Sequence, residues 1–194
     1  MDQELEVTML ARALDEFGRY VAEIQDGQWD APTPNDDWNV RELVRHNLEG
    51  VLWLPDTLSG KTIEQVGNKY AGDILGPHPH QAWVGATGKA LAAVRGLATL
   101  DSTVHLSYGD YPARTYLQQQ TIDFTIHAWD LARAIKAPER LDPELVHAVY
   151  EWFEPQAEDW RGAGMMKPAV RVPEDAPHQD RLIGLSGRNP AGPQ

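Results

Sequence analysis

Three ionisable residues within two turns of one predicted helix, Asp123, His127 and Asp130, are the residues in this sequence best placed to do chemistry. At 100° per residue they fall within about 60° of one another, and apolar residues flank that sector on both sides. A carboxylate on a buried helix face is costly unless an opposite charge compensates it. A metal ion would supply that charge, and Asp123 and His127 are four residues apart, a spacing suited to two ligands of one cation. Asp130 is then expected to act behind the ligands, holding an imidazole or a backbone group.

The same pattern also has a purely structural interpretation. Asp123 could pair with a buried arginine, and His127 could be a core histidine with an ordinary hydrogen-bond partner. A metal site would also need a third ligand from another helix, and spacing alone does not choose it. His46 lies at the edge of an apolar helix face, and His105 lies in an extended segment that could reach the same end of a bundle.

The scaffold for these residues is predicted from hydrophobic periodicity. Apolar residues recur at steps of three and four in five long segments, at 5–25, about 38–55, about 79–99, about 113–136 and about 142–160. A short helix is predicted at 62–70, a short hairpin or extended stretch at 103–111, and an irregular coil at about 162–194. Pro55 is expected to end or kink the second long helix. Antiparallel helices of this length predict an all-α, up-down four-helix bundle that forms a single domain over 1–194.

One face of the segment 113–136 is expected to contact solvent. On the helical wheel this face lies opposite the triplet of Asp123, His127 and Asp130. It carries Gln118, Thr121, Thr125, Ala132 and Lys136.

The composition excludes several classes of function. The 194 residues include no cysteine, so thiolate metal sites and cysteine nucleophiles are excluded, and thiol chemistry would need a small-molecule thiol. A metal held by nitrogen and oxygen ligands would be a borderline or hard divalent cation. The net charge of −12 argues against a nucleic-acid partner. The sequence shows no membrane span and no signal peptide, so a cytoplasmic protein is expected.

Two segments resemble the DinB-like helical bundle superfamily. Thr33-Pro34 followed by Trp38-Asn39-Val40-Arg41-Glu42-Leu43-Val44-Arg45-His46 resembles its "TP…W-x-V-R-x-L-x-x-H" segment. The segment from Asp123 to Ala134 resembles "E/D-x-x-x-H-x-W-D-L-A-R-A" of the branch of mycothiol-dependent maleylpyruvate isomerase N-terminal domains. The tail 173–190 is similar to that of a related family of actinobacterial metal-binding proteins.

The resemblance implies a DinB-like bundle and a metal triad of His46, Asp123 and His127. The isomerase branch has glutamate at the acid position, where this chain has the shorter Asp123. The chain is expected to be too short for the isomerase's extra C-terminal domain, which argues against isomerase activity itself. The implied cofactors are a divalent metal ion, zinc or nickel, and a low-molecular-weight thiol such as mycothiol.

These observations predict a metal-dependent thiol transferase or isomerase-like enzyme. The metal would generate a thiolate on the small-molecule thiol, which attacks an electrophilic substrate. The candidate pocket residues are Trp53, His105, Tyr108, Trp129 and Arg133. One alternative is a non-enzymatic structural or regulatory metal-binding module, which a fourth ligand such as His105 would favour. Another is a bundle that has lost its metal. The sequence leaves open whether the protein is a monomer or a homodimer.

Overall fold

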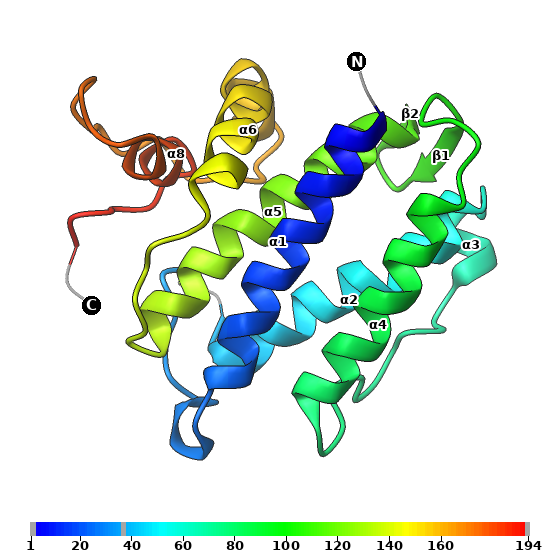
Figure 1. Cartoon of the computed structure of the whole chain (residues 1–194), viewed down its shortest axis with the longest axis horizontal. Coiled ribbons are helices and arrows are strands. Elements are labelled where there is room, and N and C mark those ends of the chain that lie inside the picture. Colours follow the sequence, from blue (N-terminus) through cyan, green and yellow to red (C-terminus); the bar gives the residue numbers. More distant parts are fainter. Residues whose placement is uncertain (1–2, 36–37, 193–194) are drawn as a thin grey trace.

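The computed structural model describes residues 3–35 and 38–192, and within them four long helices form the centre of the molecule (Figure 1). They are α1 (Gln3–Glu23), α2 (Val40–Leu58), α4 (Pro79–Arg95) and α5 (Ala113–Ala134). α1 packs along α5, and α2 packs along α4. The predicted all-α four-helix bundle is confirmed. No helix in the described ranges is both long and apolar enough to cross a membrane.

Shorter elements surround this bundle. They are η1 (Asp26–Gln28), α3 (Ile63–Val66), β1 (Thr103–Leu106), β2 (Gly109–Pro112), α6 (Pro143–Phe153), η2 (Glu154–Gln156), α7 (Ala157–Gly162) and α8 (His178–Leu185). The two strands pair antiparallel, with Val104 opposite Tyr111, so the predicted hairpin is present.

Local capping chemistry sets where α2 begins. The side chain of Asn39 accepts a hydrogen bond from the backbone N–H of Glu42 at 2.9 Å, and the Glu42 carboxylate accepts one from the Asn39 N–H at 2.9 Å. This capping box fixes the start of the helix that carries His46. Pro55 lies inside α2, which continues to Leu58, so the helix does not end at the proline.

The expectation of a solvent-facing side on the segment 113–136 is wrong for three of its five residues, while Gln118 is partly exposed and Lys136 is exposed. Thr121, Thr125 and Ala132 are fully buried, because α5 packs against α1, α2 and α6 on different sides. The two threonine hydroxyls donate to the carbonyl oxygens of Leu117 and Thr121, each at 2.7 Å. These bonds satisfy the hydroxyls without water, so threonine is tolerated in the core.

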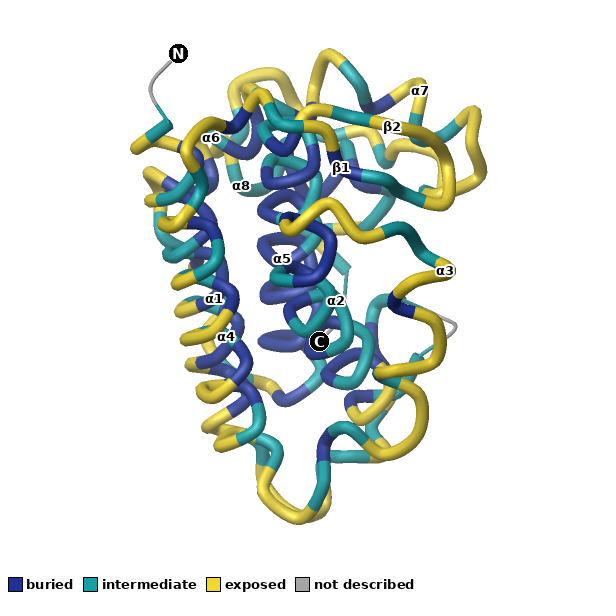
Figure 2. The backbone as a smooth tube through the Cα atoms, turned by 90° about the vertical axis from the view of Figure 1, so that its right-hand side faces the viewer, coloured by how far each residue is buried: buried dark blue, intermediate teal, exposed yellow. Residues whose placement is uncertain are grey.

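The predicted C-terminal coil contains a helix that the sequence pattern missed. α8 packs on α6 and buries Leu182 and Ile183 completely (Figure 2). A helix of eight residues is marginal alone and depends on this packing. Its close approach to the preceding segment needs a glycine, since a Cβ on Gly184 would lie 2.4 Å from Val172 Cγ2 and 2.8 Å from the Val170 carbonyl oxygen.

Gly184→Ala is therefore expected to lower the free energy of unfolding by roughly 1–3 kcal/mol, because the added methyl group meets backbone that cannot move away. Urea denaturation followed by circular dichroism measures this change. Gly162→Ala is the matched control, since a Cβ there meets nothing within 4 Å. Equal stability of the two variants would show that α8 is not held against residues 170–172.

Candidate metal centre

His46, Asp123 and His127 meet where α2 crosses the middle of α5. One ligand atom from each side chain lies within 4.8 Å of the other two, and this is the one such group of histidines and acids in the described residues. Asp123 bridges the histidines, with Oδ2 at 3.3 Å from His46 Nε2 and Oδ1 at 3.3 Å from His127 Nε2. Two imidazole nitrogens and a carboxylate oxygen this close together are donors of the kind that hold a divalent cation.

Asp130 lies directly behind His127. Its Oδ2 is 2.9 Å from His127 Nδ1, and the side chain of Asp130 is fully buried. An Nδ1–H that donates to this carboxylate fixes the ring so that Nε2 is the nitrogen that faces Asp123. Asp130 therefore lies where it can hold the His127 imidazole from behind, as expected from the sequence.

Arg188 reaches Asp130 from the C-terminal segment. Its Nε lies 3.1 Å from Asp130 Oδ1, and its Nη2 lies 2.8 Å from Oδ2. This bidentate pair neutralises a carboxylate that would otherwise be isolated in the core. The tail is therefore linked to the centre through the chain Arg188, Asp130 and His127.

The charges in the cluster shift its pKa values strongly. Burial raises the pKa of Asp123, but the two histidines outweigh burial and hold that pKa far below its usual range. Burial lowers the pKa of His127, but the carboxylates of Asp123 and Asp130 outweigh it and raise the pKa to about 9. Burial also raises the pKa of Asp130, and Arg188 and His127 together lower it below its ordinary value. His127 therefore carries a proton at neutral pH in the metal-free protein, and a cation would replace that proton.

This exchange predicts pH-dependent metal affinity. When the pH is below the His127 pKa of about 9, the Nε2 proton must leave before this nitrogen can bind a cation. The metal affinity should therefore rise about tenfold per pH unit from pH 6.5 to 8.5. Titration calorimetry in two buffers of different ionisation enthalpy should show about one proton released per ion. Affinity that does not change across this range would contradict a cation bound at His127 Nε2.

A cavity of about 420 Å³ opens over the cluster. About a third of the Asp123 side chain remains exposed, and Asp123, His46 and His127 all line this cavity. The other walls are the loop before α2, one residue of α5 and two parts of the C-terminal segment, namely Pro34, Asn35, Trp38, Ile126, Gly164, Met165, Met166, Lys167, Gly187 and Arg188. A second cavity of about 740 Å³ shares Pro34, Lys167, Gly187 and Arg188 with the first.

Trp38 covers the two histidines from one side. Its ring centroid lies 4.4 Å from that of His46 and 5.6 Å from that of His127. The indole thus packs against both imidazoles and limits their rotation, while the His46 side chain stays 42% exposed. Trp38 belongs to a sequence motif but was not among the residues predicted for the site. Met165, Met166 and Arg188 were not predicted either, because they lie far from His46, Asp123 and His127 in sequence.

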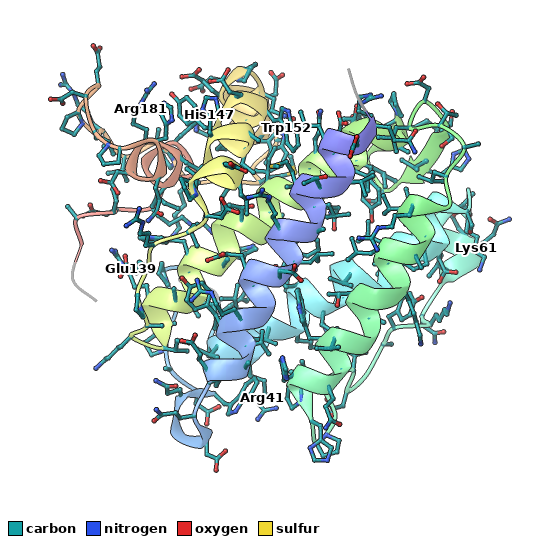
Figure 3. The ribbon with its side chains drawn as sticks, in the orientation of Figure 1. Arg41, Lys61, Glu139, His147, Trp152 and Arg181 are labelled. Atoms are coloured by element: carbon teal, nitrogen blue, oxygen red, sulfur yellow. The ribbon has the colours of Figure 1, made fainter. Side chains whose placement is uncertain are left out.

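The residues predicted to line the pocket lie away from the cavity over the cluster. Trp129 and Arg133 line the second cavity, and the Arg133 guanidinium lies 4.1 Å from the Trp129 ring centroid. Arg133 forms two hydrogen bonds with Glu139, which Figure 3 labels in the connection after α5.

The other three predicted pocket residues have partners elsewhere. His105 Nδ1 lies 2.8 Å from Asp110 Oδ1 within the hairpin, and His105 is not in the group that could hold the metal. Tyr108 contacts Tyr111 at a ring distance of 5.5 Å, and Trp53 contacts Tyr70 at 6.1 Å. The geometry therefore gives no support to His105 as a fourth ligand.

The fold and site define a helical bundle with a cluster of two histidines and one carboxylate between two of its helices. The family described as the mycothiol maleylpyruvate isomerase N-terminal domain matches residues 10–132 of the chain. The chain belongs to this family, and the resemblance seen in its motifs is confirmed. Two uncharacterized proteins of Mycobacterium tuberculosis, from strains CDC 1551 / Oshkosh and ATCC 25618 / H37Rv, are each 30% identical over 191 residues. Each match covers 91% of this chain and 94% of the relative.

Solved structures share the DinB-like fold. A crystal structure of the mycothiol-dependent maleylpyruvate isomerase matches with a TM-score of 0.74 at 15% identity, covering 99% of this chain and 92% of that chain. A histidine-to-alanine mutant of that enzyme matches with a TM-score of 0.69 at 16% identity, covering 100% of this chain and 81% of the mutant's chain. Most of both solved chains therefore has a structural counterpart in this chain.

Proposed function

We propose that His46, Asp123 and His127 bind one divalent cation, zinc or nickel. The observation that carries this proposal is the convergence of three ligand atoms within 4.8 Å, beside a buried carboxylate that holds His127 Nδ1. Three protein ligands leave coordination positions free, and the cavity of about 420 Å³ lies on that side of the cluster.

We further propose that the protein is an enzyme that acts on an electrophilic small molecule. It would either join mycothiol to that molecule or isomerise the molecule with the help of mycothiol. A bound metal would lower the pKa of a thiol and so supply a thiolate at neutral pH. This chain has no cysteine, so the thiol must come from a small molecule. Membership of a family named for a mycothiol-dependent isomerase supports mycothiol as that molecule.

The chain's own residues would perform the remaining tasks. Trp38, Ile126 and Met166 would exclude water from the cavity above the cluster. Asp130 would keep the His127 ring oriented with Nε2 toward the cavity. Asn35 and Lys167 are polar groups of the wall that could hydrogen-bond to a substrate.

The direct test is a thiol-conjugation assay with protein loaded with zinc or nickel. Metal-loaded protein should accelerate adduct formation between mycothiol and electrophiles such as maleylpyruvate or monobromobimane by at least ~100-fold over free thiol, since thiolate formation limits the uncatalysed reaction. Removal of the metal with a chelator should abolish the acceleration, and its return should restore it. His105→Ala is the matched control, because this histidine lies outside the cluster and should keep full activity. Catalysis that survives complete metal removal would exclude this mechanism.

One observation favours a second candidate function. The chain from Arg188 through Asp130 to His127 joins the C-terminal segment to the centre, so an ion could serve as a structural or regulatory link among α2, α5 and the tail. This candidate predicts that metal raises the melting temperature while no thiol or electrophile in the panel reacts faster.

A further inference from the structure

α1 and α4 run antiparallel and form one outer face of the molecule, seen from the front in Figure 1 and along the left edge in Figure 2. The outer side of α4 is exposed along its length. It carries Gln81, Val84, Gly85, Gly88, Lys89, Ala92 and Arg95.

Packing within one chain does not explain the apolar and small residues of this face. Val84 is 55% exposed. Gly85 and Gly88 lie in the middle of α4, where glycine weakens a helix relative to alanine. A Cβ at either position would meet nothing within 4 Å, whereas a Cβ at Gly18 on the inner side of α1 would lie 2.5 Å from the Trp83 ring.

The two helices carry opposite charge on their outer sides. Residues 77–100 contain no aspartate or glutamate, although the chain has 29, and Lys89 and Arg95 form no ion pair with any described residue. On α1, Asp15 is exposed and likewise forms no ion pair within the described ranges. Both arginines of α1 are already engaged, Arg12 with Asp142 and Arg19 with Glu16. The acids Glu16 and Glu23 pair with Arg19, so the outer charges without an ion-pair partner among the described residues are Asp15 on α1 and Lys89 and Arg95 on α4.

We propose that this face joins two copies of the chain into a homodimer, with α1 of each copy on α4 of the other. Two kinds of two-fold axis in the plane of the face would bring it against itself. An axis perpendicular to the helices would place α1 on α1 and oppose like charges, whereas an axis parallel to them places α1 on α4. Charge complementarity selects the second arrangement.

The heights of residues along the two helices agree with this arrangement. Trp83 Nε1 donates to the Leu14 carbonyl at 3.2 Å, and Gln3 Nε2 donates to the Leu97 carbonyl at 3.2 Å, which fixes which parts of α1 and α4 lie level. A two-fold axis parallel to the helices preserves these levels. Asp15 of the partner subunit then lies about one and a half turns from Lys89, and Ala11 of the partner subunit lies about level with Gly88. Small residues face small residues, so the helix backbones can approach closely.

The size of the face indicates the strength of the association. Two helices about 25 Å long and about 10 Å apart offer roughly 500 Å² per copy, which is at the low end for a specific interface. We therefore expect a dissociation constant in the micromolar range. The cavity over the metal cluster is lined by residues outside α1 and α4, so dimerisation and metal binding can be measured independently.

The test is sedimentation velocity of the full chain from about 1 to 300 µM in low salt. The wild-type protein should pass from monomer to dimer over this range. Lys89→Glu and Asp15→Lys should each raise the dissociation constant at least tenfold. Each substitution replaces the attraction between Lys89 and Asp15 by repulsion, and a symmetric dimer contains this pair twice. The Lys89→Glu/Asp15→Lys double variant should recover most of the affinity. Lys136→Glu, the same charge change at an exposed residue outside α1 and α4, should behave as wild type.

Metal content and circular dichroism identify any variant that fails to fold. A wild-type chain that stays monomeric up to 300 µM would overturn the proposal. A dimer whose dissociation constant is the same in Lys89→Glu as in Lys136→Glu would overturn it too, as would a double variant weaker than either single one.

Discussion

Asp123→Asn is expected to lower the affinity for zinc or nickel by at least ~100-fold. The carboxylate is the one anionic group among the three converging ligand atoms, and it lies 3.3 Å from both imidazoles. Asparagine keeps the shape but removes the charge, so the two histidines remain as neutral donors only. The substitution also removes the largest influence that raises the His127 pKa, so protons compete less with the metal in the variant. A loss of affinity must then come from the missing carboxylate–cation interaction and not from proton competition.

Isothermal titration with zinc, together with elemental analysis of purified protein, measures this effect. Asp110→Asn is the matched control, because Asp110 also contacts a histidine, His105, but on the exposed hairpin. Its metal content and affinity should equal those of the wild type. If Asp123→Asn retained one tightly bound ion per chain, the assignment of the centre would be wrong.

Arg188→Leu is expected to lower the free energy of unfolding by about 3 kcal/mol and the metal affinity by about 10- to 100-fold. Asp130 is fully buried and Arg188 is 14% exposed, so removal of the guanidinium leaves a carboxylate in the core with His127 as its remaining charged neighbour. Asp130 would then bind the protonated form of His127 more strongly and oppose metal binding at Nε2.

Urea unfolding and zinc titration of the same preparation measure both effects. Asp130→Asn combined with Arg188→Leu should regain part of the stability, because no unpaired charge stays buried, while the metal affinity should remain low. Arg19→Leu is the control for an exposed ion pair, with a loss within ~1 kcal/mol. An Arg188→Leu variant as stable as Arg19→Leu would show that the tail does not support the centre.

The C-terminal segment also has a consequence for how this chain relates to its family. The family match ends at residue 132, yet Met165, Met166, Lys167 and Arg188 form much of the wall over the centre. His46, Asp123 and His127 thus lie within the matched segment, whereas six of the thirteen residues that line the cavity lie beyond it.

Local physics made much of the protein predictable from its sequence. Periodic apolar residues and the Asn39 cap placed the long helices. Asp123, His127 and Asp130 fell on one side of a helix because spacings of four and three residues follow the helical period. The absence of cysteine limited the metal ligands to nitrogen and oxygen. The third ligand was different. Spacing left His46 and His105 open, and resemblance favoured His46.

Tertiary packing decided the rest. It brought His46 to Asp123 and left His105 with Asp110, because α2 lies beside α5 while the hairpin stays at the end of the bundle. It buried the supposed solvent face of α5, since three elements surround that helix. It also carried Arg188 back to Asp130 across 58 positions of sequence. Such contacts depend on how whole helices pack, and a helical period reports only which side of one helix is apolar. The sequence alone therefore placed Asp123, His127 and Asp130 on one side of a helix, and the fold determined which residues complete and enclose their cluster.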